Sequence, residues 1–130
     1  MTQRIHHINF LVRDLDQAVS AWQVLLGRAP DSRDHLDGRG VDIARFRLGE
    51  TWLVLVQPVR GGTEPARHLE EHGEGFFLIS LGVDDLAAEA ERLGDSRFRG
   101  SARDGLDDWR IRDLEPSEFA GVLVQLCESG

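Results

Sequence analysis

Two patterns of hydrophobic and polar residues alternate along the chain. One is typical of strands and the other has the spacing of a helix, so they predict strands and helices in turn. Branched and aromatic residues predict a strand over residues 5–12. Apolar side chains at helical spacing then predict a helix over residues 15–26. Asp14 and Gln17 form a capping pattern at its start, and Gly27 ends it.

The following segment is predicted to hold a loop, a hairpin and a short helix. Residues 28–39 are rich in Asp, Arg and Gly and lack periodicity, which predicts a loop. Alternating apolar and polar residues predict a strand over 41–48, and a tight turn leads into a second strand over 51–57, which Pro58 ends. A proline in the first turn and a glycine after the end indicate a short helix over residues 63–71.

The same pattern then restarts. A strand is predicted over 76–83, followed by a helix that Asp84 caps and that runs to Leu93. Two further strands are expected near residues 109–114 and 122–127. The order of elements therefore repeats that of the first half of the chain.

The repeat has a fixed offset. Residues 12–15 and 83–86 both stand at a strand-to-helix junction and lie 71 positions apart (83 − 12). Two copies of a strand-helix-strand-strand-strand unit predict one α+β domain with internal twofold symmetry. We expect a first module over residues 1–60, a connecting helix region over 61–75 and a second module over 76–130. Such symmetry predicts a site at the axis.

Composition narrows the range of partners. The chain has 130 residues and a formal net charge of −8, and its 15 basic side chains are all arginine. An acidic surface repels phosphate backbones, so we expect no binding to nucleic acid or to anionic membranes. No apolar run has the length of a membrane span and no signal peptide is evident, so a cytoplasmic location is expected. Cys127 is the only cysteine, which excludes an internal disulfide, and we interpret it as a small buried hydrophobic residue.

Three segments resemble one known family. The opening residues 7–15, the segment 65–75 and the ending 115–126 are similar to the vicinal oxygen chelate superfamily. This superfamily includes glyoxalases, extradiol dioxygenases, bleomycin-resistance proteins and methylmalonyl-CoA epimerases, and the resemblance is greatest to the epimerase-like branch. It implies two paired βαβββ modules whose mixed sheet forms a cup with the helices outside.

The resemblance also implies where a metal would bind. Family members usually hold a divalent ion through four side chains, and the matching positions here are His7, Val54, Leu78 and Gln125. Val54 and Leu78 have no donor atom, and strand parity predicts that His6 points outward from the cup. We therefore expect no metal and no cofactor. The alternative is a divalent metal held by an atypical set of ligands.

Parity along the strands predicts what faces the cup. The predicted lining is mainly apolar with scattered polar groups, and it contains Asn9, Trp52, Val54, Leu78, Ser80 and Gln125 beside His7. In the middle strands Ala44, Phe46, Trp109 and Ile111 are expected to pack on helices, which leaves Arg45, Arg47, Arg110 and Arg112 on the opposite faces. Arginines in a concavity suit carboxylate or phosphate groups, with Arg45 and Arg112 as the leading pair. Alternatively, these arginines lie at an open rim and pair with acidic side chains.

These observations leave three functions open. The leading hypothesis is a metal-free protein that binds a small anionic acyl or aromatic molecule, because Ile43 and Gln125 stand where the resemblance places the two glutamates of an epimerase. The second is an isomerase or lyase in which His7 acts as base and Asn9, Ser80 or Gln125 polarises a carbonyl, or in which an atypical metal site operates. The third is a structural or regulatory subunit with an empty cup. The resemblance also implies a homodimer, because members of this family commonly form homodimers, and exposed sheet edges give a physical reason for such pairing.

Overall fold

The computed structural model describes residues 2–129, which divide into two compact units. The contiguous unit consists of Ile8–Phe77, and the discontinuous unit consists of Met1–His7 with Leu78–Gly130. Two strands, β1 (Thr2–Leu11) and β5 (Gly75–Val83), contribute residues to both units. Among the described residues, no helix is long and apolar enough to cross a membrane.

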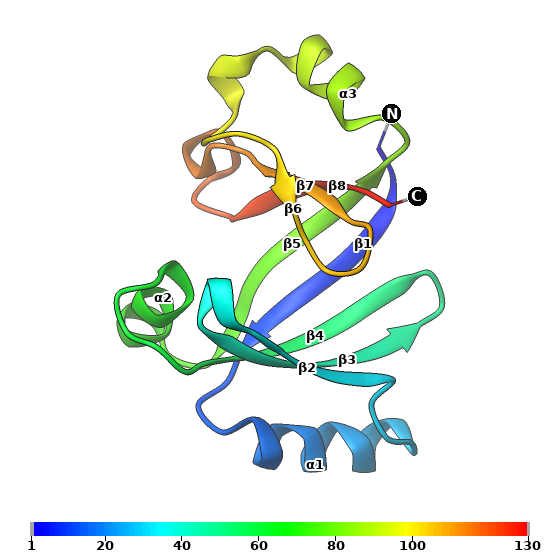
Figure 1. Ribbon diagram of the computed structural model, residues 1–130, viewed down its shortest axis with the longest axis vertical. Helices are drawn as coiled ribbons and strands as arrows, with labels where there is room; N and C mark the ends of the chain where they lie inside the picture. The colour runs from blue at the N-terminus through cyan, green and yellow to red at the C-terminus, as the bar shows by residue number, and fades with distance from the viewer. Residues whose placement is uncertain (1, 130) are drawn as a thin grey trace. The chain divides into compact units, whose positions relative to one another are not determined.

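In the contiguous unit the first helix lies against a set of strands, three of which are paired antiparallel in succession (Figure 1). Its elements are α1 (Leu15–Leu26), β2 (Ser32–Leu36), the 3-10 helix η1 (Asp37–Arg39), β3 (Val41–Leu48), β4 (Thr51–Pro58) and α2 (Glu64–His72). The strand order is β2-β3-β4-β1. Strands β3 and β4 form the predicted hairpin, with Val41 opposite Pro58 and Leu48 opposite Thr51.

Helix α1 begins and ends where the sequence predicts. The Asp14 side chain accepts a hydrogen bond from the Gln17 N–H at 3.1 Å, and Gly27 adopts a left-handed conformation with φ of 75°. The apolar face of the helix packs with the strands into a core that contains Val12, Leu15, Val19, Ala44, Phe46, Leu53 and Leu55. Burial of such side chains is the main force that holds the unit together.

The loop predicted over residues 28–39 is wrong in part, because β2 forms there. Its five residues pair with β3, from Ser32 opposite Arg45 to Leu36 opposite Val41. The inner three residues of β2 are exposed, and only its two end residues are half-buried. A strand with two open faces carries no alternation of apolar and polar residues, so periodicity could not reveal it.

The discontinuous unit repeats this arrangement with shorter strands. After β5 come α3 (Leu86–Leu93), η2 (Asp95–Arg97), β6 (Arg103–Asp104), β7 (Arg110–Asp113), η3 (Pro116–Phe119) and β8 (Val124–Glu128). The strand order is β1-β5-β8-β7-β6, and β5 and β8 run parallel. Helix α3 packs against a core of Val83, Leu86, Phe98, Leu114 and Leu126. Asp84 was expected to cap this helix, but Asp85 does so, with its side chain accepting from the Ala88 N–H at 3.0 Å.

The internal repeat is confirmed at atomic detail. In the contiguous unit the Leu15 N–H donates to Gln57 Oε1 at 2.8 Å, and in the discontinuous unit the Leu86 N–H donates to Glu128 Oε1 at 2.7 Å. Both partners of the second contact lie 71 positions after those of the first. The chain is therefore an α+β protein built from two βαβββ units. The module limits 1–60 and 76–130 remain a prediction, since the compact units divide the chain within β1 and β5.

Candidate functional site

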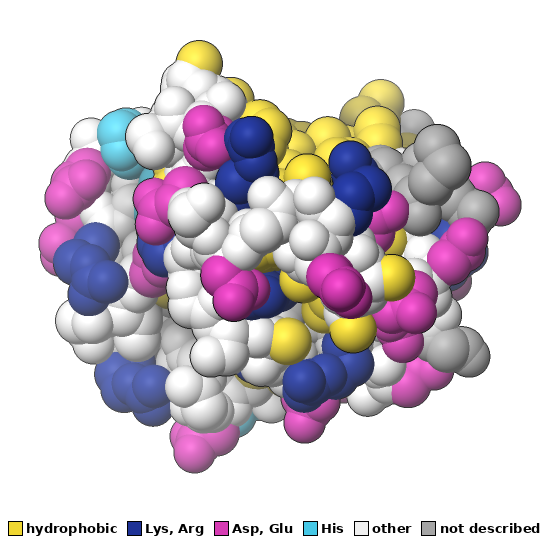
Figure 2. All heavy atoms as spheres, turned by 90° about the horizontal axis from the view of Figure 1, so that it is seen from above, with side chains coloured by type: hydrophobic (Ala, Val, Ile, Leu, Met, Phe, Trp, Pro, Cys, Tyr) yellow, Lys and Arg dark blue, Asp and Glu magenta, His cyan; other side chains and the backbone are white. Residues whose placement is uncertain are grey.

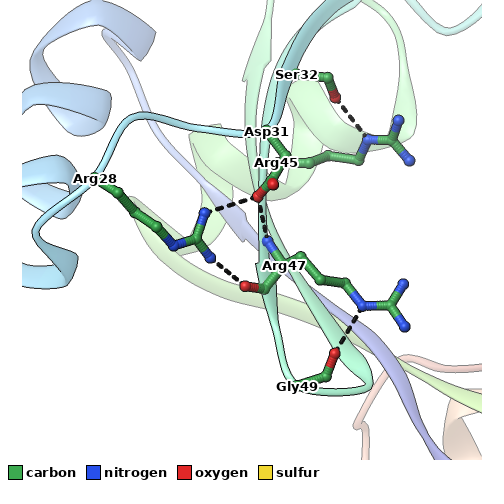
Figure 3. Close-up of polar contacts among 6 residues, drawn as sticks. All are labelled: Arg28, Asp31, Ser32, Arg45, Arg47 and Gly49. Carbon is green, nitrogen blue, oxygen red and sulfur yellow. Dashed lines mark hydrogen bonds and ion pairs between the residues drawn. The ribbon is translucent and has the colours of Figure 1, made fainter.

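A cluster of arginines lies on β3 in the contiguous unit. Ala44 and Phe46 pack in the core beneath α1, so Arg45 and Arg47 take the opposite face, as the alternation predicted. Figure 3 shows the two guanidinium groups extending to the same side of β3, while Arg28 approaches from the other side. Two cationic groups are thus held side by side on one strand.

Trp52 on β4 anchors both guanidinium groups. The Arg45 guanidinium carbon lies 4.6 Å from the centroid of the Trp52 ring, and that of Arg47 lies 5.0 Å from it. Arg45 is only 7% exposed, and its Nε donates to Ser32 Oγ at 3.0 Å. Cation–π contacts of this kind hold an arginine in place without neutralising its charge.

Asp31 lies beside these arginines, but its carboxylate binds other groups than their guanidinium ends. Asp31 Oδ2 accepts from the Arg47 backbone N–H at 2.7 Å and from Arg28 at 2.9 Å (Figure 3). These contacts, with the backbone hydrogen bond first, hold the pKa of the Asp31 carboxyl below its usual value. The Arg47 Nε donates to the Gly49 carbonyl at 2.8 Å, and within residues 2–129 its side chain makes no ion pair. Its terminal N–H groups are therefore available to an anion.

The corresponding arginines of the second half behave differently. Arg110 pairs with Asp104 at 2.9 Å, and Arg112 contacts Asp95 at 3.4 Å. The Arg112 guanidinium lies 4.2 Å from the Phe98 ring, which belongs to the core beneath α3. In this half of the chain the arginines therefore pair with carboxylates, which is the alternative stated above. The predicted register of its middle strand is wrong, because Arg112 lies on the same side of the strand as Phe98 and the core beneath α3.

Trp109 provides the second correction to that register. It was expected to pack on a helix, but its ring stacks on His7 with centroids 4.8 Å apart and planes 16° apart. The His6 ring meets the same indole edge-on at 4.5 Å. Residues 105–108 precede β7 as a turn, and they show no hydrophobic periodicity from which the register of the strand could be predicted.

His6 and His7 form a buried pair in the discontinuous unit. Each is 4% exposed, and their Nδ1 atoms are 2.9 Å apart in a hydrogen bond. The prediction that His6 points outward is therefore wrong; strand parity does not specify where the flexible end of a side chain lies. Cys127 on β8 completes the group, because one ligand atom from each of the three residues lies within 4.8 Å of the others. Burial raises the pKa of the Cys127 thiol to about 12.

Unpartnered polar atoms lie beside this group. Ser80 on β5 stands opposite Gln125 on β8, and both are buried. Gln125 Nε2 donates to Asp113 Oδ1 at 3.1 Å, whereas Gln125 Oε1 and Ser80 Oγ have no hydrogen-bond partner among the described residues. Buried polar atoms are usually satisfied, so these two are candidates for hydrogen bonds to a ligand or a water molecule.

The predicted site residues fall into two groups. His7, Leu78, Ser80, Arg112 and Gln125 belong to the discontinuous unit, and Asn9, Arg45, Trp52 and Val54 belong to the contiguous unit. Asn9 resembles Ser80 in that its Oδ1 is buried without a hydrogen-bond partner. The prediction missed His6 and Trp109, and it interpreted Cys127 only as packing. Nothing in one sequence marks these three as neighbours, because long-range strand pairing brings them together.

The four ligand positions that the resemblance implies do not fit a metal ion. Val54 is 3% exposed on β4 and, like Leu78, carries only hydrocarbon. Gln125 already uses its amide N–H on Asp113. Metal binding through side chains needs about three donors, which this set does not provide.

His35 on β2 is a solvent-exposed histidine. Its Nδ1 lies 2.6 Å from Asp42 Oδ1 and its Nε2 lies 3.5 Å from Asp37 Oδ1. The hydrogen bond to Asp42 is the main cause that raises the pKa of His35.

Known proteins with similar sequences and structures include epimerases. An ethylmalonyl-CoA/methylmalonyl-CoA epimerase from Cereibacter sphaeroides is 28% identical over 131 residues, which cover 97% of this chain and 98% of the relative. A variant of the Streptomyces coelicolor methylmalonyl-CoA epimerase in complex with 2-nitronate-propionyl-CoA has a TM-score of 0.91 and 28% identity, covering 100% of this chain and 96% of that one. These likenesses confirm the predicted glyoxalase-like fold.

The expectation that no cofactor is needed is contradicted by these relatives. A methylmalonyl-CoA epimerase in complex with methylmalonyl-CoA and NH4⁺ also matches, with a TM-score of 0.91, 28% identity and coverage of 100% of this chain and 96% of that one. An ion thus belongs to a solved complex of this group. The expectation of no metal and no cofactor is therefore withdrawn, although the four positions tested above cannot supply the ligands.

The family itself follows from a match over most of the chain. A sequence model of the Glyoxalase/Bleomycin resistance protein/Dioxygenase superfamily matches residues 6–112. This span includes both strand-to-helix junctions of the repeat, the arginine cluster and the His6–His7 pair. On this match, and on the two βαβββ units described above, the chain belongs to the Glyoxalase/Bleomycin resistance protein/Dioxygenase superfamily.

Proposed function

We propose that the chain binds a small anionic acyl compound, of which an acyl-CoA is the leading candidate. The observation that carries the proposal is the pair of guanidinium groups of Arg45 and Arg47 held over the Trp52 ring. Arginine binds carboxylate and phosphate through two parallel hydrogen bonds, and the rigid indole fixes the direction in which both guanidinium groups point. The epimerase relatives, with acyl-CoA substrates in their names, support this ligand class.

Each residue has a distinct role in this proposal. Arg47, with no ion pair among residues 2–129, takes the negative group directly. Arg45 is the buried partner that Ser32 positions. Asn9 Oδ1, which belongs to the same unit as the two arginines, is a buried acceptor without a hydrogen-bond partner among the described residues, and it can accept a hydrogen bond from the ligand.

Calorimetric titration with methylmalonyl-CoA and with 2-nitronate-propionyl-CoA tests the proposal. Arg47→Ala is expected to weaken binding roughly ten- to hundredfold, the range for losing hydrogen bonds to a charged group. The matched control is Arg33→Ala, because Arg33 is an exposed arginine paired with Asp16. Equal affinities of the wild type, Arg47→Ala and Arg33→Ala would contradict the role of the cluster.

A second candidate is an isomerase or lyase in which His7 acts as base. The His6–His7 hydrogen bond favours it, because paired imidazoles can pass a proton between them. Exchange of the α-proton of methylmalonyl-CoA in D₂O, followed by NMR, measures this activity. Loss of exchange in His7→Ala with binding retained supports the enzyme, whereas no exchange in the wild type, with binding lost in His7→Ala, supports a binding protein.

We also propose a homodimer located in the cytoplasm. The strand order leaves β2 and β6 as sheet edges, and β6 has only two residues, so β2 offers the longer edge for a partner. Light scattering of the eluted protein gives the mass directly. A monomer mass at all concentrations would rule out the dimer.

A further inference from the structure

We propose that His6, His7 and Cys127 form a zinc site within the discontinuous unit. The ligand atoms of the three residues lie within 4.8 Å of one another, and all three side chains are buried. Only His7 belongs to the four positions that the family resemblance implies. The site is therefore a different constellation, and it does not depend on the anion-binding role proposed for Arg45 and Arg47.

The nitrogen and sulfur donor atoms of the three residues indicate which metal ion would bind. Two imidazole nitrogens and one thiolate suit Zn²⁺, whereas Mg²⁺, Ca²⁺ and Mn²⁺ prefer oxygen ligands. Tetrahedral Zn²⁺ with bonds of about 2.0–2.1 Å to nitrogen and about 2.3 Å to sulfur places its ligand atoms roughly 3.3–3.6 Å apart. The His6 and His7 Nδ1 atoms, 2.9 Å apart, would separate slightly, and the widest pair would draw together by about 1 Å.

The surroundings fit a bound cation. Trp109 packs against both imidazoles and restricts the motion of their rings. Cys127 stands opposite Ile111 on β7 and Gly82 on β5. The negative charges of Asp108 and Glu128 act on its thiol and favour a cation, while the positive charge of Arg4 opposes one. The three protein donors leave a fourth position on the ion for a further small ligand such as water.

The same geometry argues against a catalytic cysteine. Cys127 is 0% exposed, so its sulfur has no access to a substrate in solution. A reactive cysteine is normally partly exposed and held as the thiolate by a positive environment. A metal ion, by contrast, deprotonates a coordinating thiol directly, so burial does not prevent its use as a ligand.

Cobalt(II) is the sharpest probe, because it replaces zinc and reports on sulfur ligation. The protein is stripped with a chelator and titrated with Co²⁺, with no acyl compound present. We expect one Co²⁺ per chain and a thiolate-to-cobalt charge-transfer band in the near ultraviolet. Cys127 is the only cysteine, so this band in the unaltered protein assigns the sulfur without any substitution. Absence of the band at saturating Co²⁺ overturns the proposal.

Competition with a coloured zinc chelator gives the affinities of the variants. Cys127→Ala and His6→Asn are each expected to weaken Zn²⁺ binding at least a hundredfold, above the effect of removing an outer-shell partner. His35→Ala is the control, since His35 is exposed and outside the cluster. Binding that Cys127→Ala leaves unchanged and His35→Ala abolishes would show surface binding and refute the site. Because no acyl ligand enters either experiment, failure here is distinguishable from failure of the proposed function.

Discussion

The Glu128 carboxylate on β8 accepts a hydrogen bond from the backbone N–H of Leu86, the first residue of α3, at 2.7 Å. The first N–H groups of a helix have no partner within it, so a side chain from a neighbouring strand can satisfy one of them. Negative charge at this end also interacts favourably with the helix dipole. A strand and a helix that are distant in sequence are therefore joined by a single acceptor.

Removal of this acceptor is expected to destabilise the discontinuous unit. Glu128→Ala should lower the free energy of unfolding by about 1.5–3 kcal/mol, the range for a hydrogen bond to a charged group. Gln57→Ala, the counterpart in the contiguous unit, should cost only about 0.5–1.5 kcal/mol, because its amide is neutral. Urea unfolding measures both, with the exposed Glu91→Ala as control. A larger effect for Gln57→Ala would contradict the assignment.

The cap of α3 offers a comparison of adjacent residues. Asp85→Ala removes the acceptor for the Ala88 N–H and should cost about 1 kcal/mol. Asp84→Ala leaves this hydrogen bond in place and should cost less. Thermal unfolding of the two variants decides between them, and an equal or larger effect at Asp84 would return the cap to the position that the sequence first suggested.

Phe46 tests the core beneath α1. It is fully buried between that helix and the strands, so Phe46→Ala should cost about 3–5 kcal/mol. Leu48, on the same strand but at the exposed end of the hairpin, provides the control through Leu48→Ala, which should cost far less. Chemical denaturation with an unchanged m-value would show that both variants retain the fold.

His35 gives the chain a defined pH dependence. Its pKa is raised from 6.5, chiefly by the hydrogen bond to Asp42. The stabilisation from the protonated form is therefore fully present below pH 6.5 and is lost as the pH rises through the higher folded-state pKa. Asp42→Asn should return the pKa of His35 toward 6.5, as NMR titration of the ring protons would measure. Asp34→Asn on the adjacent exposed position is the control, and a shift there instead would contradict the cause given.

The sequence correctly predicts the elements that have a strong local pattern. It does not predict features that depend on pairing between residues distant in the chain. Helix α1 and the β3–β4 hairpin follow their apolar spacing and caps, and the faces of Arg45 and Phe46 follow from strict alternation. Strand β2 is polar on both faces, so only its pairing with β3 reveals it. The neighbours of Trp109 depend on the turn before β7, which the sequence pattern does not specify. The prediction that Trp109 packs on a helix is therefore wrong, and its ring contacts His6 and His7 instead.

The division of the chain also sets an order of assembly during synthesis. Residues 8–77 form one continuous stretch, so the contiguous unit can fold while the ribosome is still making the second half. Residues 1–7 are made before residues 8–77, yet their partners are residues 78–130, which are made after them. The segment 1–7 must therefore wait while the contiguous unit is synthesised. His6 and His7 can meet Cys127 only after that, so the zinc site proposed above would form late in the assembly of the protein.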